Sequence, residues 1–382
     1  MPGSNAVGDR RWKAVAVAAL VMVLPGGAVP EAHKTITSKY TYSEHVFPIL
    51  KSRCGRCHFE GGSTPMSLLS YRDAVPWAES IRHQLISGAM PPSFVDPLGP
   101  AVRNGHPITP REIDALITWA VGGTPEGDGA AVAGPAVRPK WSSGSPDATF
   151  EMPAEHTLGV GLAEDVYDFT IRTAFGSERW VTSIDLHPGT PSLVRSATVV
   201  TGDGQVLGAW VAGDGVVRAP RGTAFRLAPD SQIRVQIRYR KHWRDETRAV
   251  SDRSTLGVYF DDAPAAGRSI ESRTVEVLPS ESRGSVPVGA PLGRSVRILG
   301  VLPVLREAYA GIAVDAVMPT GRRLPLLRLQ AVRPDWTRRY WLAEPVELPA
   351  DAQIEVQVTP DSGPAAVPWR EPLHITLDWV PL

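Results

Sequence analysis

The sequence predicts a multidomain protein in which an all-α domain is followed by an all-β region of tandem sandwiches. Two observations predict this order. Between residues 43 and 122 the apolar residues recur with helical spacing, and beyond residue 148 they alternate with the period of two that is typical of strands. The 35 glycines and 36 prolines also favour a chain with many turns, as β-sandwiches require.

Charge and cysteine content narrow the class of protein. The 382 residues include 40 basic and 40 acidic side chains, so the formal net charge is zero. Proteins that bind nucleic acid need a basic surplus, so we expect no nucleic-acid partner. The two cysteines, Cys54 and Cys57, lie three positions apart, so no disulfide framework can span the chain.

Residues 1–28 are typical of an export signal. Arg10, Arg11 and Lys13 precede an apolar run over residues 14–24, and small residues follow it. A membrane span needs about 20 apolar residues, so this run is too short for one. We expect cleavage, no membrane span afterwards, and a periplasmic or otherwise exported protein. The alternative is a retained N-terminal membrane anchor, and the paired arginines also fit twin-arginine export.

The motif Cys54-Gly55-Arg56-Cys57-His58 predicts one covalently bound haem c. Each thiol can form a thioether to a haem vinyl group, and the imidazole of His58 can ligate the iron. A thioredoxin-like redox pair would need a surrounding βαβ pattern, which is missing. A structural zinc site would need a second pair of ligands, and the chain has no other cysteine.

Helical patterns surround this motif over residues 34–128. A first helix is expected after Ser43 and leads into the motif, and a second carries an apolar stripe from Ala74 to Leu85. A third begins at the capping box Thr109–Glu112 and ends at Gly122. Three helices around one such motif resemble a class I cytochrome c.

Met90 is the first candidate for the sixth iron ligand. It precedes two prolines, which stiffen an extended loop that could present its thioether to the iron. Met66, His45, His83 and His106 are the alternatives.

A small-residue linker over residues 129–147 separates the predicted haem domain from the β region. The length of that region suits two sandwiches, over residues 148–265 and 266–382. Alternating apolar residues predict strands at three places within it: residues 233–239, 354–358 and 373–379.

Nearly the whole chain resembles exported cytochromes fused to a copper type II, ascorbate-dependent monooxygenase-like module. The resemblance rests on these segments: Thr64–Tyr71, Met90–Pro92, Pro220–Gly222, Asp252–Ser254, Gly257–Phe260 and Tyr340–Pro345. It implies two jelly-roll sandwiches related to those of peptidylglycine α-hydroxylating monooxygenase.

The copper ligands of that module are missing from the matching positions. The resemblance implies a His-His pair where this chain has Arg195 and Ser196, and a His-x-His pair where it has Arg238 and Arg240. The β region contains only four histidines, none adjacent to another or two apart: His156, His187, His242 and His374. We therefore expect no copper centre.

Three functions stay open from the sequence. The first is an exported one-electron carrier in which the copper-free β module acts as a docking or structural platform. Its partner would be a redox protein or a membrane electron-transfer complex. The second is a copper monooxygenase that uses haem as an electron relay. The third is a structural subunit of a membrane-associated redox complex. A basic strip from Arg234 to His242 fits either a solvated edge or a docking patch for an acidic partner.

Overall fold

The computed structural model describes residues 35–92, 94–103, 105, 107–128, 140–265, 268–279, 286–360 and 371–382. The described residues from Ile36 to Leu382 belong to one compact unit. The predicted export signal over residues 1–28 lies outside the described residues.

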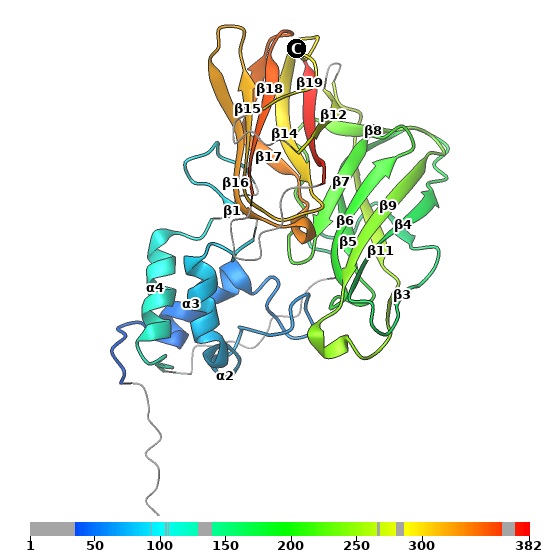
Figure 1. Cartoon of the computed structure of the whole chain (residues 1–382). Coiled ribbons are helices and arrows are strands. Elements are labelled where there is room, and N and C mark those ends of the chain that lie inside the picture. The colour runs from blue at the N-terminus through cyan, green and yellow to red at the C-terminus, as the bar shows by residue number, and fades with distance from the viewer. Residues whose placement is uncertain are drawn as a thin grey trace, which may run out of the picture. The chain divides into compact units, whose positions relative to one another are not determined.

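Within the described ranges the α-helices are few and short, and they lie before residue 122. Their bounds are α1 (Phe47–Ile49), α2 (Tyr71–Ala74), α3 (Ala78–Ile86) and α4 (Pro110–Val121), with π-helical turns at Tyr42–Val46 and Leu50–Cys54 on either side of α1. Figure 1 shows α3 and α4 side by side. The predicted capping box of α4 is confirmed: Thr109 accepts from the Glu112 amide, and Glu112 accepts from the Thr109 amide.

Prolines explain why the other predicted helices are interrupted. Pro76 lies in a 3-10 turn, Val75–Trp77, that divides the predicted second helix into α2 and α3. Pro48 is the second residue of the three-residue α1. Proline has no amide hydrogen to donate within a helix and collides with the preceding turn, so regular α-helix does not extend through these positions.

The expected all-α cytochrome c domain is wrong as a description of this fold. Strands account for 41% of the chain and helices for only 15%, so the structure is mainly β. The N-terminal region even supplies a strand, β1 (Phe94–Val95), which pairs with β16 (Arg323–Val332). The periodic apolar stripes were correct as core positions, but they do not build an independent helical bundle.

The first sandwich packs a four-stranded sheet, in the order β4-β9-β6-β7, against strands β2, β5, β8 and β11. The bounds of the four-stranded sheet are β4 (Glu164–Arg172), β6 (Val194–Thr201), β7 (Val206–Val211) and β9 (Gln232–Arg240). The facing strands are β2 (Ala148–Glu151), β5 (Arg179–His187), β8 (Ala224–Leu227) and β11 (Thr255–Asp261). A small separate sheet pairs β3 (His156–Leu158) with β10 (Val250–Asp252).

The second sandwich packs a five-stranded sheet, in the order β1-β16-β15-β18-β13, against strands β12, β14, β17 and β19. The remaining strands of the five-stranded sheet are β13 (Val286–Val288), β15 (Tyr309–Val317) and β18 (Gln353–Pro360). The facing strands are β12 (Ser269–Val277), β14 (Val296–Val304), β17 (Tyr340–Leu348) and β19 (Leu373–Pro381). The three strands predicted from alternating residues are confirmed as β9, β18 and β19.

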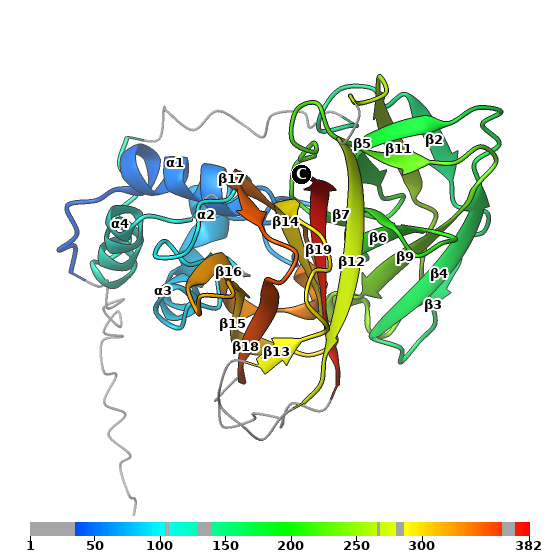
Figure 2. The same ribbon diagram turned by 90° about the horizontal axis from the view of Figure 1, so that it is seen from above.

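One sheet runs through both sandwiches. The parallel pairing of β12 with β8 joins their inner sheets into eight strands, in the order β17-β14-β19-β12-β8-β5-β11-β2. Figure 2 shows β12 between the two groups of strands.

A buried ion pair also links the two sandwiches. Arg339, just before β17, pairs with Asp378 on β19 and donates to the carbonyls of Val206 and Leu207 on β7.

Candidate functional site

Cys54, Cys57 and His58 lie within one turn of chain. Cys54 ends the π-helical turn Leu50–Cys54, and its carbonyl accepts from the amides of Cys57 at 3.1 Å and His58 at 2.9 Å. The two thiols do not form a disulfide with each other. The turn therefore presents two reduced sulfurs and one imidazole from five consecutive residues.

Cys54 packs at the edge of the helical core. Burial, with smaller contributions from Cys57 and Glu112, raises the pKa of the Cys54 thiol to about 12. Arg53 pairs with Glu112 on α4 at 3.0 Å and so fixes the start of the motif to that helix. Because the thiolate is the nucleophilic form, Cys54 is unreactive in this setting.

His58 has an imidazole enclosed by the loop that follows the motif. Burial lowers its pKa, and the Met66 carbonyl beside the ring partly offsets that shift. Thr64 Oγ1 holds the loop by donating to the carbonyls of Cys57 at 2.9 Å and Met66 at 3.2 Å. The buried Nδ1 of His58 has no hydrogen-bond partner among the described residues. The ring is therefore neutral near pH 7, which is the form that ligates iron.

The candidate sixth ligands are dispersed. Met90 follows α3, and its side chain is 39% exposed. Met66 approaches His58 through its carbonyl group. The His45 Nδ1 accepts a hydrogen bond from the Thr41 amide, just before the π-helical turn Tyr42–Val46. The His83 side chain is exposed on α3. His106 lies outside the described residues. The choice among these ligands stays a prediction.

The Cys57 side of the motif lies against the first sandwich. Its Sγ donates to the Ala212 carbonyl at 3.3 Å, just beyond the end of β7. The next residue, Gly213, has a φ of +82°. A Cβ at Gly213 would lie 2.4 Å from Cys57 Sγ and 2.8 Å from the Arg56 carbonyl oxygen, so only glycine fits this contact.

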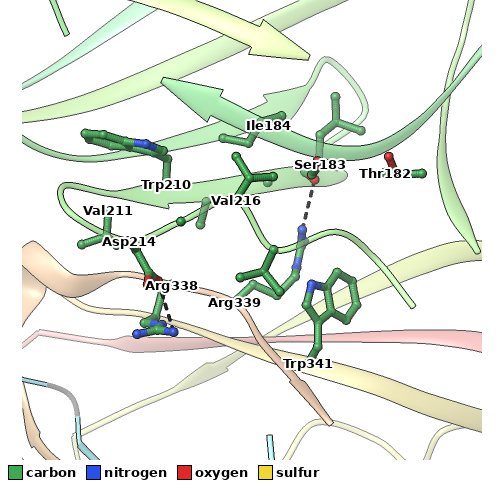
Figure 3. A pocket seen from close by; sticks show the side chains of 15 residues that line it. Thr182, Ser183, Ile184, Trp210, Val211, Asp214, Val216, Arg338, Arg339 and Trp341 are labelled. Atoms are coloured by element: carbon green, nitrogen blue, oxygen red, sulfur yellow. Dashed lines mark hydrogen bonds and ion pairs between the residues drawn. The ribbon is translucent and has the colours of Figure 1, made fainter. Parts of the chain in front are cut away.

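Two further polar contacts join the residues around Cys57 to the first sandwich. Asp214 lies between two guanidinium groups, 3.1 Å from Arg338 and 3.8 Å from Arg56. Figure 3 shows the pair of Asp214 with Arg338. On the other side, the His242 Nε2 is 3.0 Å from the Ser63 carbonyl oxygen. These contacts fix residues 54–63, the attachment segment, to the turn after β7 and to the residues that follow β9.

The four positions where the resemblance implied copper ligands lie on neighbouring strands. Arg195 and Ser196 are on β6, Arg238 and Arg240 are on β9, and Ser196 is the register partner of Arg238. Asp335, from a 3-10 turn, lies 3.0 Å from Arg240 and 3.9 Å from Arg238. Burial lowers the pKa of Arg195 to about 10, against the effect of Asp335. Arg238 and Arg240 therefore both lie against Asp335, and the Arg240 side chain stays mostly exposed.

Sequence reasoning missed the acidic members of this site. Asp214 and Asp335 are far from Cys57 in sequence, and a single sequence carries no signal for such contacts.

The four histidines of the β region lie on separate elements: His156 on β3, His187 on β5, His242 after β9 and His374 on β19. Across the described ranges, no three His, Cys, Asp or Glu side chains group closely enough to hold a metal ion. The expectation of a cytochrome c domain joined to a monooxygenase-like module is therefore wrong.

A small cavity lies between the two sandwiches, near Asp214 (Figure 3). Its volume is about 40 Å³, and it is lined by side chains that include Ser183, Arg338, Arg339 and Trp341. The Ser183 hydroxyl is buried and has no partner among the described residues. This volume holds a water molecule but no substrate.

Comparison with known proteins identifies no family. No family model matches the chain, and no curated protein matches it. The major capsid protein P2 of bacteriophage PM2 matches with a TM-score of 0.28 and 12% identity, over 61% of this chain and 97% of the other. A Paenibacillus xanthan lyase matches with a TM-score of 0.18 and 9% identity, over 68% of this chain and 28% of the other. The exported protein XepA of PBSX matches with a TM-score of 0.17 and 10% identity, over 61% and 86%. Likenesses this weak support no argument about function.

The resemblance to cytochromes fused to a copper monooxygenase-like module is thus wrong as an assignment. It relied on short segments, and the mainly β fold and the comparisons do not support it. Among the described residues, no helix is both long enough and apolar enough to cross a membrane.

Proposed function

We propose that this chain binds one haem covalently through Cys54 and Cys57, with His58 on the iron, and transfers single electrons. The observation that supports this proposal most is the shared turn. It offers two reduced thiols and a neutral, buried imidazole that lacks a partner at Nδ1. A haem held in this way needs only one imidazole from this segment, so a cluster of three protein ligands is not required.

A bound haem supplies one-electron chemistry at its iron. The chain itself holds the attachment segment in place. Arg53 ties it to α4. In the haem-free chain, Ala212, Asp214 and His242 also tie it to the first sandwich. The β-sandwiches would act as a docking or structural platform for the redox group. An exported redox protein or a membrane electron-transfer complex would be its partner.

The direct test is expression in a host that attaches haem to exported proteins, followed by a denaturing gel stained for haem peroxidase activity. We expect the wild-type chain to keep its haem on the gel. A variant with both Cys54→Ala and Cys57→Ala should lose it. A His58→Ala variant should change the absorption spectrum of whatever haem it retains.

Two outcomes would contradict the proposal: a wild-type chain without haem, or pigment that stays bound to the double cysteine variant. A matched control is His374→Ala, which alters a partly exposed imidazole on β19 that is not a candidate ligand and should change neither attachment nor spectrum. For the sixth ligand, Met90→Ala should remove the weak band at the red edge of the oxidised spectrum. If that band is unchanged, the ligand is not Met90.

A further inference from the structure

The turn Ala212–Asp214 packs directly against one side of the Cys57 sulfur, and the Cys57 residue is otherwise partly exposed. The thiol hydrogen points to the Ala212 carbonyl oxygen, with Sγ at 3.3 Å from it. On the adjacent side, the position of a Cβ at Gly213 is only 2.4 Å from Sγ. A carbon bonded to the sulfur on this side would occupy the space of the turn.

The turn cannot yield easily, because it is anchored at both ends. The Ala212 amide donates to the Arg195 carbonyl on β6 at 2.8 Å, which continues the pairing of β6 with β7. Asp214 donates its own amide to Val211 at 3.0 Å, and its carboxylate lies between Arg338 and Arg56. The Arg56 contact is exposed enough to break, whereas the less exposed Arg338 contact ties the turn to the segment before β17 of the second sandwich.

We propose that the turn Ala212–Asp214 guards Cys57: it positions the thiol and keeps it from reacting until the attachment segment moves off the first sandwich. Docking of the turn and a group bonded to Cys57 Sγ in place of the hydrogen that Ala212 accepts exclude each other. The chemical nature of that group does not matter, so the inference goes beyond the proposed haem attachment and stands without it.

Cys54 and Cys57 are therefore protected in different ways. Cys54 is protected by the helical core and by its raised pKa. Cys57 is protected by residues that lie 155 positions further along the chain. Only Cys57 should become reactive when the contact with the first sandwich is weakened.

Alkylation of the haem-free, reduced full chain by iodoacetamide tests this. The reaction forms an S–C bond at Sγ, iodide leaves, and the thiol proton passes to water. Trypsin then separates the two thiols, because Arg53 and Arg56 precede Cys54 and Cys57. Mass spectrometry of the two peptides gives both rates from one sample.

We expect Cys57 in the native chain to react at least about tenfold more slowly than in urea-unfolded chain, because reaction needs a local opening. Gly213→Ala should raise the alkylation rate of Cys57 by about tenfold and leave the alkylation rate of Cys54 unchanged. Gly204→Ala is the matched control. It has a φ of +91° at the other end of the same strand pair, and nothing lies within 4 Å of its would-be Cβ. It carries the same backbone strain without the contact, so neither rate should change.

A second variant keeps the test decisive if Gly213→Ala does not fold. Asp214→Asn preserves the shape of the side chain and removes the charge that faces Arg56. It should also raise the alkylation rate of Cys57, by a smaller factor than Gly213→Ala. The inference is overturned if Cys57 reacts as fast in the native chain as in urea. It is equally overturned if the two glycine variants speed Cys57 alike. A chain that attaches no haem but shows the guarded Cys57 would contradict the proposed function and leave this inference intact.

Discussion

Removing the guanidinium of Arg339 should destabilise the protein more than removing any exposed arginine. Arg339 is 7% exposed and Asp378 is fully buried, and Arg339 Nε lies 2.7 Å from the Asp378 carboxylate. The guanidinium also donates to Leu207 at 3.1 Å and Val206 at 2.6 Å, and so connects the two sandwiches. The variant Arg339→Met keeps the apolar stem and deletes these bonds.

The size of the loss in unfolding free energy follows from the state in which Arg339→Met leaves Asp378. Asp378 would retain one neutral donor, the Ser272 hydroxyl at 2.6 Å, and would lose its countercharge in a site without water contact. Breaking a buried ion pair by removing one partner costs about 3–5 kcal/mol, because an uncompensated charge stays buried. A second substitution, Asp378→Asn, removes that charge, so the double variant should be more stable than Arg339→Met alone.

Urea unfolding followed by tryptophan fluorescence measures the effect. The matched control is Arg297→Met, because Arg297 pairs with Glu347 at 2.7 Å on the same sandwich while both side chains are well exposed. Such a pair contributes below about 1 kcal/mol. The reasoning from burial is refuted if Arg339→Met lowers the free energy of unfolding no more than Arg297→Met does. It is also refuted if the double variant is less stable than Arg339→Met alone.

Two further predictions concern titration. The folded pKa values of His58, His187 and His242 lie below the unfolded value, mainly through burial, so only the unfolded chain gains their protons as the pH first drops below about 6.5. The free energy of unfolding of the haem-free chain should therefore fall between pH 7.5 and 5.5 in urea titrations. His58→Gln should flatten that fall, and an unchanged slope would show that His58 is not buried in its neutral form. For Cys54, Glu112 is one of the groups that raise the thiol pKa, so Glu112→Gln should lower that pKa and let Cys54 alkylate at lower pH. Asp114→Asn, on the same helix, is the control; equal profiles for both variants would contradict an electrostatic role for Glu112.

The sequence predicted local features better than it predicted contacts. The period of two located β9, β18 and β19, and the capping box located α4, because these signals arise from neighbouring residues. Helical turns do run over residues 42–54 and 71–86, as the apolar spacing predicted, but Pro48 and Pro76 leave only short stretches of regular α-helix. The role of the turn at Gly213 and Asp214 depends on Cys57 and Arg338, which are distant in sequence. The family resemblance failed for a related reason: short matching segments do not fix how a chain packs.

Strand β1 has a consequence for how this protein can be produced. It pairs with β16 at the edge of a sheet, and nearby Val102 is a core residue of the second sandwich that bridges to Leu342. An uncovered strand edge is a template for intermolecular pairing. A fragment beginning after residue 139 would lose both β1, which covers the edge of β16, and the core residue Val102. Expressed alone, it should aggregate, and supplying residues 35–128 as a second polypeptide should restore its solubility.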